Sequence, residues 1–176
     1  MTDLLDLAVM AHGGLDRWNK VNSVRVAASI TGAIWFVKGK GDALKNVVMT
    51  IDTRKERLTT DFLDQDKRTV FESARIVIEK TDGTLIDARN DPEKSFQGQK
   101  RETPWDDIYV DGLLRRHDYT VDILGGARGL NYASEYRDVD GIIIPTKRRI
   151  YAYEGDDRLV KEPLLVAIDM GEITLT

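Results

Sequence analysis

The fold is decided by residues 22–31, which read Asn-Ser-Val-Arg-Val-Ala-Ala-Ser-Ile-Thr. From Val24 to Thr31 one alternating set of residues is apolar and the other is polar or small. The first set holds Val24, Val26, Ala28 and Ile30, and the second holds Arg25, Ala27, Ser29 and Thr31. A period of two places successive side chains on opposite faces of an extended chain. The stretch therefore predicts a half-buried β-strand.

The same period recurs along most of the chain after this strand. Further strands are predicted at residues 33–37, 45–52, 56–62, 68–72, 75–80, 85–89, 106–110, 113–124, 130–137, 142–153, 164–170 and 173–175. The sequence Thr81-Asp82-Gly83-Thr84 lies between two of them, and Asp-Gly favours a type I′ hairpin turn. Successive strands joined by short turns predict an antiparallel sheet.

The residues before this region have helical spacing instead. Leu4, Leu5, Ala8, Val9, Leu15 and Trp18 can form one apolar stripe on a helix over residues 3–18. The pair Gly13-Gly14 lowers helix propensity, so the helix can also end there and restart at Leu15. The predicted fold is mainly β (α+β), a single domain over residues 1–176. It is a curled antiparallel sheet or half-open β-barrel with an N-terminal helix covering it.

Composition excludes several classes of protein. The chain has 176 residues, 41% of them hydrophobic and 32% charged, as in a globular protein. It has no cysteine, which excludes disulfides, thiol nucleophiles and cysteine zinc sites, and no cofactor is expected. A net charge of −4 argues against a nucleic-acid partner. No apolar run is long enough to span a bilayer and no export signal is visible, so we expect a cytoplasmic protein.

A cluster of basic residues on two predicted strands is the candidate binding site. Arg115, Arg116 and His117 with Tyr119 lie on one strand, and Arg148 with Tyr151 lies on another, beside Lys147 and Arg149. Cationic side chains there could hold an anionic head group while apolar residues accept its tail. The alternative is that Arg116, Asp118, Asp122 and Arg148 form cross-strand ion pairs on a solvated face.

Two motifs that suggest catalysis have simpler interpretations. His117 and Asp118 are adjacent in a predicted strand, so their side chains point to opposite faces and cannot form a dyad. An enzyme using His117 would need an acid from another strand. Gly125-Gly126-Ala127-Arg128-Gly129 lacks the spacing and the following helix of a dinucleotide-binding loop. His12 is interpreted as a helix-surface or interface residue, and no catalytic residue is assigned.

Three stretches carry a resemblance to known proteins. Asp111 to Tyr119, Gly125-Gly126 and Tyr136 to Arg149, which contains Val-Asp-Gly-Ile-Ile-Ile-Pro, resemble an uncharacterised bacterial family. The opening Ala-His-Gly-Gly-Leu-Asp-Arg-Trp at 11–18, followed by a strand, resembles that of the lipoprotein-carrier (LolA-like) superfamily. This resemblance implies a half-open antiparallel barrel with helices around an apolar cavity.

Three functions remain open from the sequence. The first is non-catalytic binding of an apolar or amphipathic, lipid-like small molecule in the half-barrel. The second is a hydrolase or isomerase using His117. The third is a protein-interaction module that assembles through a sheet edge or a concave face, and homo-oligomer formation is left open.

Overall fold

The computed structural model describes residues 4–91, 94, 116–121, 127–155 and 158–176, with the backbone alone for 116–121 and 127. Its helices are α1 (Leu4–Ala11), α2 (Leu15–Trp18) and α3 (Ala33–Val37). Its strands are β1 (Ser23–Thr31), β2 (Val47–Asp52), β3 (Arg57–Phe62), β4 (Lys67–Glu72), β5 (Arg75–Glu79), β6 (Leu85–Asn90), β7 (Arg116–Val121), β8 (Ala127–Val139), β9 (Ile142–Glu154), β10 (Arg158–Val160) and β11 (Val166–Leu175).

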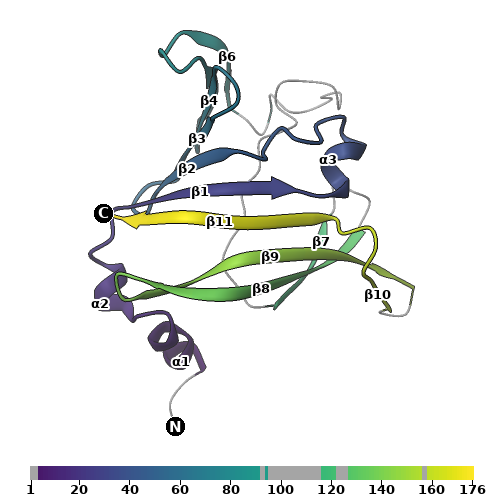
Figure 1. Ribbon diagram of the computed structural model, residues 1–176. Helices are drawn as coiled ribbons and strands as arrows, with labels where there is room; N and C mark the ends of the chain where they lie inside the picture. The colour runs from purple at the N-terminus through teal and green to yellow at the C-terminus, as the bar shows by residue number, and fades with distance from the viewer. Residues whose placement is uncertain (1–3, 92–93, 95–115, 122–126, 156–157) are drawn as a thin grey trace.

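All of these strands belong to one antiparallel sheet. Its order is β6-β5-β4-β3-β2-β1-β11-β9-β8-β7, with β10 paired to β9. The sheet curls without closing, since β6 and β7 end the order and do not pair with each other within the described residues (Figure 1). The predicted mainly β fold with a curled antiparallel sheet is therefore confirmed.

The main apolar core lies on one side of the central strands, which we call the core face. Its buried residues are Ala28, Ile30, Trp35, Leu44, Val47, Phe62, Ile150, Val166 and Ile168. In β1 the apolar positions Val26, Ala28 and Ile30 are buried, whereas the positions between them are half-buried. The alternation seen in the sequence is thus the alternation between the core face and the opposite face.

Two predicted elements have different structures. Residues 33–37 form helix α3 and not a strand, between Gly32 at φ 126° and Gly39 at φ 69°. These backbone conformations are open mainly to glycine and turn the chain out of the sheet on both sides. Residues 164–170 and 173–175, predicted as two strands, contribute to the single strand β11. The predicted strand at 106–110 lies outside the described residues.

Two Asp-Gly hairpin turns lie within the described residues, and they differ in type; Asp111-Gly112 lies outside those residues. Between β5 and β6 only Gly83 has positive φ, and the register shifts by one residue after Ile78. This is a turn with a glycine bulge, so the predicted type I′ turn is wrong there. Between β8 and β9, Asp140 and Gly141 both have positive φ, at 49° and 83°, as a type I′ turn requires.

The N-terminal helices lie at the end of the sheet where β8 turns into β9 (Figure 1). A side chain at Gly13 would come within 2.1 Å of the Gly141 carbonyl oxygen, so the helix backbone touches the turn. Nearby, Trp18 packs on a second core of Val21, Ile142, Ile144 and Leu175. The sequence allowed the N-terminal helix to end at Gly13-Gly14 and restart at Leu15. The structure has this break, which separates α1 from α2. None of the helices in the described ranges is both long and apolar enough to cross a bilayer.

Candidate functional site

Strand β9 presents two chemically different faces. Thr146, Arg148 and Ile150 are buried. The residues that alternate with them, Lys147, Arg149 and Tyr151, are only partly buried. Because side chains alternate along a strand, the buried set belongs to the core face. The period of two in residues 142–153 predicts the same separation, with Thr146, Arg148 and Ile150 on one face and Lys147, Arg149 and Tyr151 on the other, and burial confirms it. This separation also places a guanidinium group on the inside of the protein.

Arg148 is 2% exposed and is surrounded by apolar positions in its row of the sheet. It pairs with Ala133 of β8 on one side and with Ile168 of β11 on the other. Ile168 in turn pairs with Ile30 of β1, and both isoleucines belong to the main core. A buried guanidinium is costly unless anions or hydrogen-bond acceptors meet it, so this position has a demanding electrostatic requirement.

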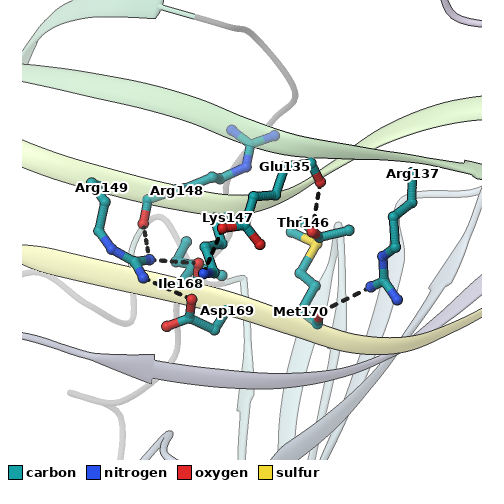
Figure 2. A network of polar contacts seen from close by, with 9 residues as sticks. All are labelled: Glu135, Arg137, Thr146, Lys147, Arg148, Arg149, Ile168, Asp169 and Met170. Carbon is teal, nitrogen blue, oxygen red and sulfur yellow. Dashed lines mark hydrogen bonds and ion pairs between the residues drawn. The ribbon is translucent and has the colours of Figure 1, made fainter.

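The ion pairs of the region lie on the opposite face (Figure 2). Arg149 donates from Nη2 to Asp169 Oδ1 at 2.7 Å and from Nη1 to the Ile168 carbonyl at 3.1 Å. Lys147 Nζ lies 2.6 Å from Glu135 Oε1. These side chains are partly exposed, so a ladder of charges on a solvated face does exist. Arg149 and Lys147 are the basic members of this ladder. The alternative that placed Arg148 on a solvated face is wrong, because Arg148 is buried.

One residue of β8 interrupts the pairing beside this site without shifting the register. Glu135 has φ 52° and is left out of the pairs, but Ser134–Lys147 and Tyr136–Pro145 keep the same register, which places Glu135 opposite Thr146. The Thr146 hydroxyl donates to the Glu135 carbonyl at 2.6 Å (Figure 2). The register is therefore unchanged through Thr146, Arg148 and Ile150, which stay on the core face.

The structure does not bring all of the predicted site residues together. Tyr151 is three positions from Arg148 and lies on the opposite face, where its ring centroid is 6.2 Å from that of Tyr132. Arg116, His117 and Tyr119 lie in β7, whose backbone pairs them with Tyr132, Asn131 and Gly129. Their side chains and all of Arg115 lie outside the described part of the chain.

Two polar residues near Arg148 were missed from the sequence. Asn131 is buried and pairs with Ile150, so it shares the core face with Arg148 one row away. Thr146, also buried, occupies the next core-face position along β9. The available signal was alternation in residues 129–133, which places Asn131 in phase with Ala133. Together, Asn131, Thr146 and Arg148 form a polar group on an otherwise aliphatic face, and we call it the Arg148 group.

The chemistry available here is binding of an anion. Arginine offers five donors in a fixed fork and stays cationic, so it can hold a carboxylate or phosphate but cannot accept a proton. His12 has a structural position, with Nδ1 2.8 Å from the Ile143 carbonyl oxygen, as expected for an interface histidine. In the described ranges, no three His, Asp or Glu side chains gather as a metal-binding cluster.

Comparisons with known proteins identify structures but no family. No protein-family model and no curated protein matches the chain. A LolA superfamily protein from Nitrosomonas europaea aligns with 8% identity and a TM-score of 0.43, covering 89% of this chain and 87% of its own. A DUF1329 family protein from Desulfovibrio piger aligns with 12% identity and a TM-score of 0.44, covering 97% and 90%.

A third solved structure is the lipoprotein LppX from Mycobacterium tuberculosis. It aligns with 13% identity and a TM-score of 0.34, covering 98% of this chain and 97% of its own. The first of these structures is from the superfamily that the sequence resemblance indicated.

Proposed function

We propose that this protein binds an amphipathic small molecule with an anionic group, without catalysis, on the core face of its curled sheet. The observation that carries the proposal is Arg148, a permanently charged side chain that is 2% exposed in a row of Ala133, Ile168 and Ile30. A guanidinium with five donors can meet an anionic group in addition to its partners within the protein, and its aliphatic neighbours suit hydrocarbon, so a lipid-like molecule matches both.

The anionic group would be held by the Arg148 group. A charge-assisted hydrogen bond contributes roughly 1.5–3 kcal/mol when partly shielded from water. The five donors of the guanidinium allow a ligand and protein acceptors to be bound at the same time. Asn131 and Thr146 add neutral polar atoms on either side, as expected where a head group needs orientation as well as charge.

The hydrocarbon would lie along the aliphatic rows that continue from Arg148. Beyond Ile168 and Ile30 the main core includes Trp35, Leu44 and Val47. Each buried methylene group contributes about 0.8 kcal/mol, so a chain of several methylenes would supply most of the affinity. Long-chain carboxylates are therefore preferred over short ones.

The test compares a fluorescent long-chain fatty acid with its neutral methyl ester. We expect Arg148→Met to weaken the binding of the fatty acid carboxylate by about tenfold or more, because such a loss of affinity corresponds to one charge-assisted hydrogen bond. The methyl ester should bind both proteins within about threefold, because its hydrocarbon contacts are unchanged. Arg149→Met is the matched control, since Arg149 follows Arg148 in β9 and its guanidinium pairs with Asp169 on the opposite face.

Native mass spectrometry of freshly purified protein gives an independent reading. A carried-over anionic lipid would support the proposal, and its mass would limit its identity. If the folded protein binds neither the fatty acid nor the ester, the proposal is wrong. Equal losses in Arg148→Met and Arg149→Met would likewise remove the assigned role of Arg148.

A further inference from the structure

A second surface combines exposed hydrophobic side chains with lysines at the end of the sheet that carries α3. Phe36 and Val37, at the end of α3, are 67% and 79% exposed, and Leu63 after β3 is 57% exposed. Lys38 and Lys40 follow the exposed pair directly in the sequence. Large apolar side chains exposed in a group are uncommon on soluble proteins and mark surfaces that meet a partner.

These side chains belong to one continuous surface. The Phe36 ring lies against Gly41, because a side chain there would come within 2.6 Å of Phe36 Cε1. Gly41 also lines a cleft of about 610 Å³ between residues 39–45 and residues 64–67, directly after Leu63. The register pairs Val47 with Phe62 and Phe62 with Lys67, so both loops lie at the same end of the sheet. We call Phe36, Val37 and Leu63 with Lys38, Lys40, Lys45 and Lys67 the α3 tip.

The α3 tip is rigidly attached to the sheet. The backbone N–H groups of Ala33 and Ile34 donate to the carbonyls of Leu164 and Leu165 at 3.0 and 3.2 Å. Trp35 is buried in the main core, while Phe36 and Val37 next to it face solvent. The exposure of these two side chains is therefore a property of a fixed turn of helix. Figure 1 shows α3 projecting at the opposite end of the sheet from α1 and α2.

Charge at the α3 tip favours an anionic partner. Lys38 Nζ lies 5.5 Å from the centroid of the Trp35 ring, and Lys67 Nζ lies 4.0 Å from that of Phe62. The same loops also contain the acids Asp42, Asp64 and Asp66, so four lysines and three acids leave a local charge of +1 in a protein of net charge −4. Asp42 lies 3.6 Å from Lys45, Asp64 accepts a hydrogen bond from Asn46 at 3.0 Å, and Asp66 accepts one from the Thr81 hydroxyl at 2.5 Å.

We infer that the α3 tip docks on the surface of a lipid bilayer that contains anionic lipids. Phe36, Val37 and Leu63 would enter the boundary between head groups and acyl chains, and the lysines would lie among the lipid phosphates. Aromatic and aliphatic side chains beside lysines suit this boundary, where a protein groove would demand a more specific shape. This inference rests on the exposed end of the sheet and is independent of the ligand proposed for the core face.

The experiment uses the absence of cysteine from the chain. Val37→Cys carries a single nitrobenzoxadiazole label, and Leu5→Cys, at an exposed position of α1, carries the same label as the control. Vesicles contain phosphatidylcholine alone or phosphatidylcholine and phosphatidylglycerol in equal parts. We expect the label at 37 to shift to the blue with the mixed vesicles and the label at 5 to keep its emission. The α1 control is apt because its exposed apolar residues flank Asp6 and not lysines.

Unlabelled variants then separate hydrophobic insertion from charge. We expect Phe36→Ser with Val37→Ser to weaken binding to the mixed vesicles by about tenfold or more. Lys38→Gln and Lys40→Gln should each weaken it by about fivefold, whereas the exposed Lys20→Gln at the other end should change nothing. Circular dichroism checks that each variant is folded.

Two outcomes would overturn the inference. One is the absence of a blue shift at position 37, or an equal shift at positions 37 and 5. The other is a wild-type dimer in sedimentation velocity that Phe36→Ser with Val37→Ser converts to a monomer, without vesicle binding by either protein. That result would assign the α3 tip to a second copy of this chain. Fatty acid binding in the absence of vesicles reports on the core face alone, so it distinguishes a failure of docking from a failure of ligand binding.

Discussion

Arg148 and Arg149 follow one another in β9, yet their guanidinium groups lie on opposite faces of the sheet. Arg148 is buried on the core face, and Arg149 donates to Asp169 Oδ1 at 2.7 Å on the other face (Figure 2). The two guanidinium groups therefore have different surroundings, since Arg148 lies in the apolar core and Arg149 is partly exposed to water. A measurement that changes on substitution of Arg148 and not of Arg149 reports on the face of the sheet and not on the net charge of the protein.

Stability should respond differently to the two arginines. We expect Arg148→Met to lower the free energy of unfolding by about 1–3 kcal/mol, because it keeps the volume of the side chain but leaves the groups that meet the buried guanidinium without their donor. Arg148→Ala should cost about 3 kcal/mol or more, because it also leaves a cavity. Urea unfolding measures both. The Arg149→Met control should change the value by less than about 1 kcal/mol, as for a partly exposed ion pair.

A loss as large as that of Arg148→Ala would contradict this expectation and would make the guanidinium a structural requirement of the fold. A modest loss of stability with weakened fatty acid binding is the combination expected of a residue kept for function.

The pair Gly13 and Gly14 provides a test of how the helices are held on the sheet. Both have positive φ, at 102° and 82°, but only Gly13 touches the β8–β9 turn. Gly14→Ala should cost about 1–3 kcal/mol for the backbone conformation alone, because φ 82° with ψ 159° is open essentially to glycine. Gly13→Ala should cost more, because its side chain would lie 2.1 Å from the Gly141 carbonyl oxygen and the helix must move away.

Urea unfolding of the two variants, with the amide shift of Gly141 as a local probe, measures the difference. Equal costs for the two alanine variants would show that the contact with the turn contributes nothing.

The pKa of Asp66 should depend on a hydroxyl from a distant turn. The side chain of Thr81 and then its backbone N–H donate to Asp66 Oδ1, at 2.5 and 3.1 Å, and lower the pKa of this carboxyl below 3.8. The hydrogen bonds favour the charged form in the folded state. Their stabilisation is therefore present above pH 3.8 and is lost as the pH falls through the lower folded pKa.

Thr81→Val removes the hydroxyl and keeps the backbone donor, so the pKa of Asp66 should rise part of the way toward 3.8. A titration followed by carboxyl carbon shifts in NMR measures it. Asp82 is an internal control in the same spectra, because the Thr84 backbone N–H lowers its pKa and is untouched by the change. An unchanged Asp66 would contradict the assigned cause.

Most of the sheet could be predicted because its strands have clear alternation. In β1 and β9 a single apolar face decides both the strand and its orientation, and burial follows the predicted phase. The helix α3 could not be predicted in this way. Residues 33–37 are five in number and almost wholly apolar, and such a run fits a buried strand as well as a short helix. The glycines on either side decided the outcome through φ.

Arg148 could be predicted from the sequence as a site residue, but the residues that surround it could not. Alternation separated Arg148 from Arg149, but the sequence gives no rule for which of two basic faces is buried. That depends on the row of strands across the sheet, which β9 reaches through β11, and β11 in turn pairs with β1 from the other end of the chain. The place of Asn131 beside Ile150 depends on the β8–β9 register. Tyr151 was grouped with Arg148 by proximity in sequence, whereas the pleat of β9 separates them.

The position of β11 has a consequence for how the protein is made. This strand follows every other strand in the chain, yet it lies in the middle of the sheet between β1 and β9 (Figure 1). On the ribosome, strands β1 to β6 emerge first, and β7 to β9 emerge later with no described strand to join them to β1. Until β11 arrives, β1 and β9 both expose backbone donors and acceptors that will end in the centre of the sheet. The nascent protein is thus two open half-sheets, and its greatest exposure to chaperones and to aggregation comes just before synthesis of β11.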